Sequence, residues 1–367
     1  MPEITLDNVC KKFDDSVAAD NLCLNIRDGE YVCILGPTGA GKTTCMRMIC
    51  GLTVPDSGRI LFDGEDITNK DIDLRNATML SQTYSLFPHM SVYDNVMFAP
   101  KIHEWPESTS KQIVRSMMNM VHLEQKADWM PNQLSGGQQQ RIALARALAS
   151  GSKVLLLDEP LRALDARLRI NLRKELRSMA KEMGLTCIHV THDQDEALEM
   201  ADRIAVIRKG RIIQFDTPKD VFDNPATPFV ANFVGRSNVL VGKVRSVGEK
   251  TVVEVGPGIF MEARSGAVTI DQDVVLTIKV GSTKIRHRDE NTDGAYCTGR
   301  IERILYEGVT ITVEVMVEGV GIISSKLPNR KFDDYKVGEE VEISWSYDKA
   351  SVFPMPSNGL EEEMRLD

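Results

Sequence analysis

One stretch of nine residues, Gly36–Thr44, constrains the fold of this chain more than any other part of its sequence. Its residues, Gly-Pro-Thr-Gly-Ala-Gly-Lys-Thr-Thr, match the phosphate-binding pattern G-x-x-x-x-G-K-S/T. The apolar run Tyr31–Leu35 before it is typical of a buried strand, and Cys45–Cys50 after it continues a helix that begins near Gly41. The sequence therefore predicts a strand, a loop and a helix in the order that this motif requires.

The residue types in this loop suit the binding of a nucleoside triphosphate. Glycines let several backbone N–H groups turn toward one anion, and the start of the helix adds partial positive charge. Lys42 would supply an ammonium group for the outer phosphates, and Thr43 would bind Mg²⁺. A glycine-rich turn without a ligand would need neither group, so we predict that the chain binds a nucleoside triphosphate. The loop residues predicted to contact the nucleotide are Gly36, Pro37, Thr38, Gly39, Ala40, Gly41, Lys42, Thr43 and Thr44.

Length and charge limit the remaining classes of function. At 367 residues the chain is long enough for two or three domains, and its formal net charge of -9 argues against a general nucleic-acid binder. Seven cysteines without a C-x-x-C pair fit reduced thiols in a cytoplasm better than a disulfide or zinc framework. No apolar stretch approaches the roughly 20 residues of a membrane span, so any membrane role would depend on a partner.

A second candidate anion site lies at a pair of glycines in the middle of the chain. Leu134–Gln138 precedes the Ala- and Leu-rich run Gln139–Leu148, which predicts a helix with Ser135 as its N-cap. Gly136 and Gly137 would leave the first N–H groups of that helix open to an anion. Such a site has two possible uses: a separate anion, or the far side of the same triphosphate in a neighbouring subunit. A capped helix without a ligand is the plainer alternative, although two glycines lower helix stability.

Two buried strands are predicted to end in residues suited to catalysis. Val154–Leu157 is a continuous apolar run that ends at Asp158 and Glu159, and open α/β sheets place ligand chemistry at such strand ends. Asp158 suits Mg²⁺, and Glu159 suits the polarisation of an attacking water as general base. Cys187–Thr191 is another apolar strand, and His192 directly after it is a candidate donor to the γ-phosphate.

Two further candidates have plain structural alternatives. Phe13 could stack on a nucleobase, but the sequence is equally consistent with a buried aromatic residue. Gln82 leaves a predicted strand end and could touch Mg²⁺ or the attacking water, or it could be an ordinary solvated loop residue.

The hydrophobic pattern changes from about Gly235 onward. Segments such as Val239–Val244, Thr251–Val255 and Thr310–Val317 alternate apolar and polar residues between turns of Gly, Asp and Asn. This pattern predicts a separate small all-β domain of barrel type. Some small barrels bind oligonucleotides, but the required combination of stacking and basic residues is missing from the sequence.

Taken together, these motifs resemble the ATP-binding subunits of ABC importers that carry a C-terminal β-barrel (TOBE) regulatory domain, of the maltose and polyamine type. The most specific mark is Leu134–Gln138, the ABC signature, at the expected distance before Val154–Pro160, the Walker B strand. The resemblance implies an α/β P-loop NTPase with ABC-type β and helical subdomains, followed by an all-β OB-like barrel. It implies an ATP-binding domain over 1–235, with its helical subdomain at about 84–150, and a TOBE-like domain over 236–367.

The resemblance also implies a role for each motif residue. Gly36–Thr44 would be the Walker A loop, Gln82 the Q-loop glutamine and Asp165 the D-loop aspartate. The implied catalytic residues are Glu159, His192, Gln82 and Lys42. The implied nucleotide contacts outside the loop are Phe13, Gln82, Ser135, Gly136, Gly137, Gln138, Asp165 and His192. The implied Mg²⁺ ligands are Thr43, Gln82 and Asp158.

The same family pattern implies an assembly. Two copies would dimerise head to tail, with each ATP between the Walker A loop of one copy and Ser135–Gly137 of the other. Mg²⁺-dependent hydrolysis would drive two transmembrane permease subunits, which would contact the segment Tyr84–Val96. The system would include an extracytoplasmic solute-binding protein and no nucleic acid. The subunit would lie at the cytoplasmic face of the membrane, held there by its partners.

Three positions depart from the family pattern. Ser81 stands where a Phe is common, Arg162 replaces a frequent Ser, and Lys279–Ser282 lacks the usual Arg-Pro-Glu. Two other functions remain open: a soluble ABC ATPase in translation or DNA repair, or a chiefly regulatory module whose β domain binds a transcription factor or a small ligand. Soluble ABC ATPases usually carry two ATPase units or a long coiled coil, which this sequence lacks. The sequence does not name the transported solute.

Overall fold

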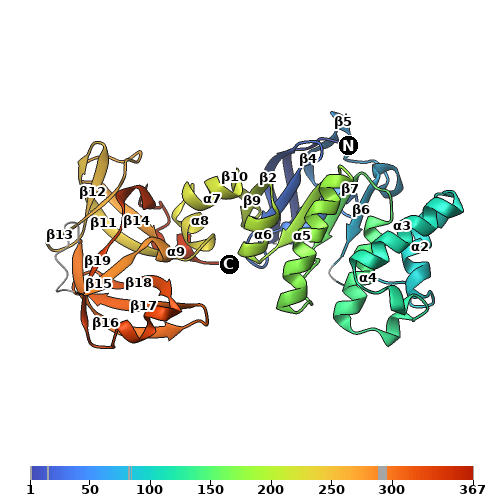
Figure 1. Cartoon of the computed structure of the whole chain (residues 1–367). Helices are drawn as coiled ribbons and strands as arrows, with labels where there is room; N and C mark the ends of the chain where they lie inside the picture. The colour runs from blue at the N-terminus through green and yellow to red at the C-terminus, as the bar shows by residue number, and fades with distance from the viewer. Residues whose placement is uncertain (1, 15, 82, 84, 288–295, 367) are drawn as a thin grey trace. The chain divides into compact units, whose positions relative to one another are not determined.

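The chain folds into two units, which are described separately. The computed structural model, shown in Figure 1, describes residues 2–14, 16–81, 83, 85–287 and 296–366. The first unit is Met1–Pro218 and the second is Lys219–Leu366. We predicted the boundary between residues 235 and 236, whereas the structure divides the chain after Pro218. The difference is the connecting segment 219–235, which groups with the second unit.

The strand before the phosphate-binding loop lies in the middle of a six-stranded sheet. The sheet order is β10-β9-β3-β8-β7-β6, and β3 pairs in parallel with both β8 and β9. Apolar runs that are buried on both faces are typical of central parallel strands. The carboxyl ends of β3, β7 and β8 consequently lie along one edge, where ligands bind in open α/β sheets. The strands are β3 (Tyr31–Leu35), β6 (Ala77–Leu80), β7 (Val154–Asp158), β8 (Thr186–Thr191), β9 (Arg203–Arg208) and β10 (Arg211–Asp216).

A second, antiparallel sheet covers the helix that follows the loop. Its order is β2-β1-β4-β5, formed by β1 (Ile4–Phe13), β2 (Ser16–Ile26), β4 (Ser57–Phe62) and β5 (Glu65–Asp66). The helix α1 (Lys42–Cys50) contributes Met46, Met48 and Ile49 to a buried core shared by both sheets. This core fixes the start of α1 relative to the strand ends of the parallel sheet.

Helices complete the first unit. Figure 1 shows α2 (Val92–Ile102), α3 (Glu107–Met120) and α4 (Gly136–Leu148) as one group, and these helices pack on each other. The methionines Met117 and Met118 of α3 are buried there, so their side chains serve packing. Two more helices, α5 (Ala166–Glu182) and α6 (Gln194–Met200), follow β7 and β8. The described 3₁₀ turns of the chain are Ile72–Arg75, Glu124–Lys126, Pro131–Gln133, Val280–Ser282, Asn329–Asp334 and Tyr347–Lys349.

The second unit is built from two five-stranded antiparallel sheets. Their orders are β13-β12-β11-β14-β20 and β15-β19-β16-β17-β18, and their facing side chains form one buried cluster. The strands are β11 (Ser237–Val247), β12 (Lys250–Gly256), β13 (Ile259–Arg264), β14 (Asp273–Lys279), β15 (Lys284–His287), β16 (Cys297–Tyr306), β17 (Thr310–Val317), β18 (Gly321–Pro328), β19 (Glu340–Ser344) and β20 (Ala350–Pro354). Short helices flank them: α7 (Pro218–Asp223), α8 (Pro228–Phe233) and α9 (Leu360–Met364). The predicted α/β fold with an all-β C-terminal part is confirmed.

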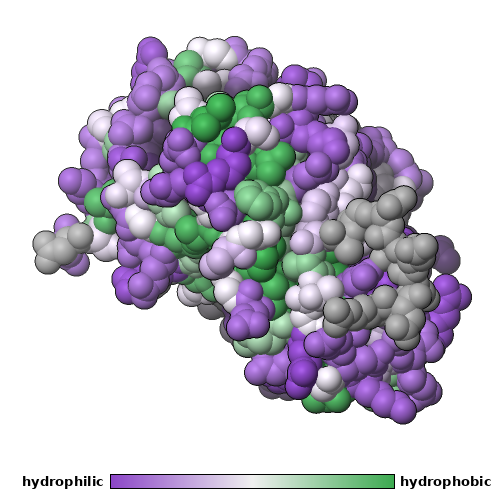
Figure 2. Space-filling model, turned by 90° about the vertical axis from the view of Figure 1, so that its left-hand side faces the viewer, coloured by the Kyte–Doolittle hydropathy of each residue, from purple (hydrophilic) through white to green (hydrophobic). Residues whose placement is uncertain are grey.

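Hydrophobic side chains are not confined to the cores. Figure 2 views the side on which β13, β15 and β16 are labelled in Figure 1, and hydrophobic residues gather across its middle with hydrophilic residues around them. Exposed apolar side chains of the second unit include Phe260, Ile270, Tyr306 and Val309. Within the described ranges of the chain, every helix is too short or too polar to cross a membrane.

Candidate functional site

The loop between β3 and α1 requires glycine at two crowded positions. A Cβ at Gly36 would lie 2.3 Å from the carbonyl oxygen of Ile207, and one at Gly41 would lie 2.0 Å from that of Ala18. Gly41 also has a φ of +97°, which other residues rarely adopt. It precedes α1, whose first turn contains no acidic residue. The first N–H groups of α1 are therefore open to an anion.

Lys42 is folded back into this loop. The residue is only 8 % exposed, and its Nζ donates hydrogen bonds of 2.8 Å to the carbonyl oxygens of Gly36 and Pro37. Burial lowers the pKa of Lys42, and the nearby carboxylates of Glu159 and Asp158 oppose that change. The site thus concentrates a buried cation and two acids around one loop.

A hydroxyl and a carboxylate face each other at the start of α1. Thr43 Oγ1 donates to Asp158 at 3.1 Å from Oδ2 and 3.3 Å from Oδ1. Burial raises the pKa of Asp158, and the hydrogen bond from Thr43 partly offsets that rise. Both groups are oxygen donors of the kind that Mg²⁺ prefers, and Mg²⁺ often takes only one or two protein ligands beside phosphate and water oxygens. The residues present therefore fit Mg²⁺.

Glu159 follows Asp158 in a strained backbone conformation. Its φ is +51°, its N–H donates to the Val190 carbonyl at 3.0 Å, and its own carbonyl accepts from Gln140 Nε2 at 3.1 Å. Its carboxylate accepts hydrogen bonds from Arg162 at 2.7 Å and from His192 at 3.2 Å. Burial raises the pKa of Glu159, but these two partners outweigh it and leave the pKa below its usual value.

His192 is carried by a loop with a dense hydrogen-bond network. Thr191 Oγ1 donates to Glu196 at 2.5 Å and accepts from the Asp193 N–H at 3.0 Å. Asp193 in turn accepts from the Glu196 N–H and pairs with Arg173 at 2.8 Å. The imidazole itself is more than half exposed, and its Nδ1 donates to Glu159 because a carboxylate can only accept. The network holds the backbone of the loop while the ring faces the site.

The signature residues open α4 as the sequence predicts. Ser135 precedes the helix, and its N–H donates to Gln138 Oε1 at 3.1 Å. A Cβ at Gly136 would meet nothing within 4 Å, so packing inside this chain does not explain that glycine. For Lys42, Thr43 and Asp158, no hydrogen bond or ion pair within the described residues reaches the signature. The structure therefore separates the predicted nucleotide contacts into two groups.

One connecting residue was missed by the sequence analysis. Gln140 of α4 is 1 % exposed; its Nε2 donates to the Glu159 carbonyl, and its Oε1 accepts from the Ala163 N–H at 3.1 Å. A buried glutamine on a helix rich in Ala and Leu was the available signal. It joins the signature helix to the turn after β7.

Comparison with known proteins adds the family. An ABC transporter family model matches residues 19–162, and a TOBE domain model matches residues 274–353. The spermidine/putrescine import ATP-binding protein PotA of Haemophilus influenzae is 39 % identical over 350 residues, which cover 94 % of each chain. The protein of the same name from Marinobacter nauticus is 38 % identical over 373 residues, covering 99 % of this chain and 98 % of that protein. This chain belongs to the ATP-binding subunits of ABC importers.

A solved structure supports the same family. The ATP-binding cassette MJ0796, in a dimeric post-hydrolysis state bound to ADP and Pi, is 32 % identical with a TM-score of 0.54, covering 59 % of this chain and 98 % of that one. The importer ATPase described here thus binds and hydrolyses ATP and carries a TOBE domain. The predictions of family, ATPase activity and import function are confirmed. These findings favour import over the alternative of a soluble ABC ATPase in translation or DNA repair.

Three other predicted site residues of the ATPase have different outcomes. Phe13 is 47 % exposed at the end of β1, so it is not the buried aromatic residue that the sequence also allowed. Asp165 caps α5 by accepting from the Leu168 N–H at 3.0 Å. Gln82 lies outside the described residues.

The predicted permease-contact segment Tyr84–Val96 is described except for Tyr84. Asn95 is fully buried and organises it: its Nδ2 donates to the carbonyls of Phe87, Met90 and Ser91, and its Oδ1 accepts from the Phe87 N–H. The Phe87 ring also packs on Phe98, with 4.5 Å between ring centroids. The hydrogen bonds of Asn95 therefore hold this segment in a turn. The buried asparagine is a second residue that the sequence did not predict.

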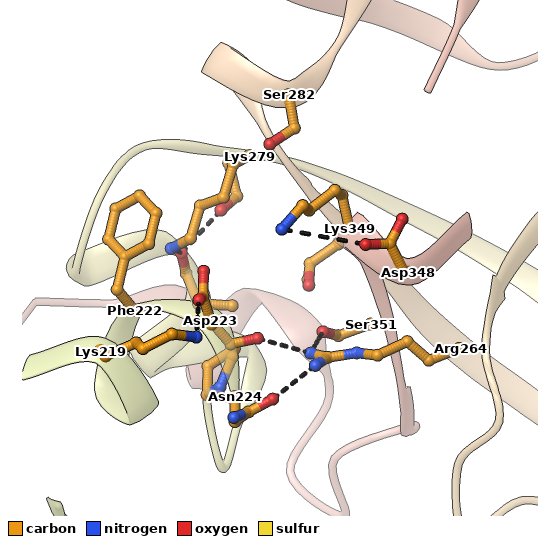
Figure 3. Close-up of a pocket in the computed structure, with 14 residues that line it drawn as sticks. Lys219, Phe222, Asp223, Asn224, Arg264, Lys279, Ser282, Asp348, Lys349 and Ser351 are labelled. Carbon is orange, nitrogen blue, oxygen red and sulfur yellow. Dashed lines mark hydrogen bonds and ion pairs between the residues drawn. The ribbon is translucent and has the colours of Figure 1, made fainter. Parts of the chain in front are cut away.

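The TOBE-containing unit has a polar cavity of about 320 Å³, drawn in Figure 3. Arg264 donates to the Asp223 carbonyl at 2.7 Å and to Asn224 at 2.5 Å, and Lys219 pairs with Asp223 at 2.7 Å. Lys279, at the departure from the family's Arg-Pro-Glu, donates to the carbonyls of residues 231, 234 and 235 at the end of α8. Arg264 and Lys279 thus fasten the short helices to the strands, while the ion pair of Lys219 lies within α7.

Proposed function

We propose that this subunit hydrolyses Mg·ATP at Gly36–Thr44 and thereby powers the import of a polyamine. The observation that carries the catalytic part is the convergence of Lys42, Thr43, Asp158 and Glu159 on one loop. The observation that carries the polyamine is that relatives matched over nearly the whole chain are named for spermidine and putrescine import.

The phosphates would bind at the start of α1. The open N–H groups and the ammonium of Lys42 would hold the negative charge of the β- and γ-phosphates. The carbonyl bonds of Lys42 show that its amine reaches the interior of the loop. Thr43 and Asp158, together with Gln82, would hold Mg²⁺, which when bound neutralises charge that develops on the phosphates.

Glu159 would act as the general base toward the attacking water. It is the second acid after a buried strand, and its backbone is fixed by β8 and α4. His192 would donate to the γ-phosphate and respond to its loss, since its ring already lies beside Glu159. General-base catalysis of this kind is typically worth 10²- to 10⁴-fold in rate.

The signature would complete the site of a second copy. Gly136 faces open space, and the hydrogen bonds of Lys42 within the described residues go to Gly36 and Pro37, not to the signature. A head-to-tail homodimer would place Ser135–Gln138 of one copy over the nucleotide of the other, beside Asp165 and Phe13. The dimeric state of the cassette MJ0796 supports this arrangement.

The remaining assignments concern the assembly. Two transmembrane permease subunits would contact the turn within Tyr84–Val96, and an extracytoplasmic solute-binding protein would deliver the polyamine. The ATPase would lie at the cytoplasmic face of the membrane, without nucleic acid. Residues 1–235 would form the ATP-binding domain, with its helical subdomain at about 84–150, and residues 236–367 the TOBE-like regulatory domain.

Uptake of labelled spermidine by cells that lack this subunit tests the proposal. We expect uptake to be lost, to return with the wild-type chain, and to stay lost with Lys42→Ala, while uptake of maltose is unchanged throughout. Normal spermidine uptake in the deletion strain, or loss of maltose uptake instead, would overturn the assignment of a polyamine as the solute.

A further inference from the structure

The carboxylate of Glu159 is already engaged on both oxygens. Arg162 Nη1 lies 2.7 Å from Oε2, and His192 Nδ1 lies 3.2 Å from Oε1. A general base needs a lone pair directed at the attacking water, and each of these hydrogen bonds occupies one. The residue proposed to activate water is therefore held by two neighbours.

Arg162 belongs to the same turn as Glu159. Its backbone N–H donates to the Glu159 carbonyl at 3.3 Å, which closes the turn directly after β7. Its side chain is 57 % exposed while that of Glu159 is 15 % exposed, so the guanidinium group reaches in from the solvent side. Among the described residues, Glu159 is the one side chain with which Arg162 forms an ion pair or hydrogen bond. The guanidinium is consequently free to leave if the turn shifts.

This turn is attached to the start of the signature helix. The Ala163 N–H donates to Gln140 Oε1, and the Ala163 carbonyl lies so close to Gly137 that a Cβ there would approach it to 3.0 Å. Gln140 also holds the Glu159 carbonyl at 3.1 Å. A change at the first turn of α4 is thus transmitted by direct contacts to the residues on either side of Arg162.

We propose that Arg162 is a positioning residue that holds Glu159 in a resting orientation until the signature helix engages the nucleotide of a partner copy. The proposal rests on the function proposed above for Glu159. In the resting subunit the Arg162–Glu159 pair directs the carboxylate into its own turn. Engagement of the signature moves Ala163 and Gln140, the pair opens, and Glu159 turns to the water. Hydrolysis is thereby restricted to the assembled dimer.

Steady-state ATPase assays of the full chain with Mg²⁺ test this inference. Arg162→Ser should raise kcat in the absence of membrane subunits by about two- to fivefold, the amount expected for loss of an exposed ion pair, with KM unchanged. Arg162→Lys keeps the charge and should retain a rate close to wild type. Arg167→Ser removes an exposed arginine five residues later and serves as the matched control with an unchanged rate.

The outcomes separate this inference from the function on which it rests. ATP affinity by calorimetry checks that each variant is folded. If Glu159→Gln remained active, the assignment of the base would fail. If Glu159→Gln were inactive and Arg162→Ser had a wild-type or lower kcat, or if Arg167→Ser gained as much, the positioning role of Arg162 alone would be refuted. The double variant Arg162→Ser/Glu159→Gln should show no gain over Glu159→Gln.

Discussion

At the scale of single residues, Glu159 is the group whose geometry most limits the chemistry. Its left-handed φ places the side chain at the end of β7, and contacts with Val190 and Gln140 hold that backbone in place. Such strain persists where surrounding structure fixes it, and it is common at functional sites. The backbone contacts do not involve the carboxylate, so a change of the side chain should alter turnover more than folding.

Replacing Glu159 by Gln tests the general base directly. We expect turnover to fall by roughly 10²-fold or more while ATP binding is retained, because the amide is nearly isosteric but cannot accept the proton. ATPase assays and calorimetry on the same sample measure both properties. Glu182→Gln, at the end of α5, is the control. A Glu159→Gln chain with wild-type turnover would remove Glu159 from this role.

Lys42→Ala should reduce nucleotide affinity rather than turnover alone. The variant removes the buried ammonium group that the loop holds beside two acids, and with it the charge that would face the outer phosphates. Calorimetric titration with ATP measures the loss, with Lys174→Ala on the exposed face of α5 as the matched control. Unchanged ATP affinity in Lys42→Ala would contradict the assignment of the loop.

The sequence predicted these residues because each belongs to a contiguous motif. Lys42 and Thr43 follow the loop glycines, and Asp158 and Glu159 come at the end of an apolar run. The order of neighbouring residues in the sequence was therefore enough to predict them. The partners of Glu159 were not predictable in the same way. Gln140 lies 19 residues before it and meets it only through packing of α4, and the bond to Arg162 depends on the geometry of the turn.

At the scale of elements, Asp202 joins the parallel sheet to the helix α5. Its carboxylate accepts from the Tyr31 N–H at 2.8 Å, where β3 begins, and from Arg177 of α5 at 3.0 Å. Lys181 of the same helix also bonds to it. Burial raises the pKa of Asp202, but the hydrogen bonds from Lys181 and Tyr31 outweigh that rise and leave the pKa below its usual value.

This direction of the shift sets the pH dependence of stability. A lowered pKa means that the folded state favours the ionised form, so the contribution is present above the unfolded pKa of about 4 and is lost at lower pH. We expect Asp202→Asn to lower Tm at pH 7 by about 2–4 °C, the effect of about 1 kcal/mol. Thermal unfolding should show that difference shrinking below about pH 4. Asp128→Asn, an exposed position, is the control; a constant difference across pH would contradict the role of the charge.

Elements were easier to predict than their pairing. The apolar runs that became β3, β7 and β8 are continuous in sequence, and the three alternating segments named after residue 235 became β11, β12 and β17. The sheet order was not available, because it depends on contacts such as β3 with β9, which lie far apart in the sequence. Asn95 was missed for the same reason, since only the folded turn shows that it bonds to three carbonyls.

At the scale of the whole molecule, the central claim is that one chain carries two half-sites. The loop side contains the buried Lys42 and the two acids at the end of β7, Asp158 and Glu159, and the signature side presents Gly136 to open space. Gln140 links the two sides within one chain, so a signature bound to a partner's nucleotide can affect the chain's own Glu159. In the TOBE-containing unit, residues around the polar cavity fasten short helices to strands.

The most direct measurement mixes two inactive full-length variants, Lys42→Ala and Ser135→Arg. In a head-to-tail dimer of one copy of each, both substitutions fall in the same site and the other site is intact. Each variant alone should be inactive, and an equimolar mixture should recover at most about a quarter of the wild-type ATPase rate, since half of the dimers are mixed and each has one working site. In that site Arg162 still holds Glu159, which should lower the recovered rate further, by about two- to fivefold. A mixture no more active than its separate components, or full activity of Ser135→Arg alone, would contradict the two half-sites.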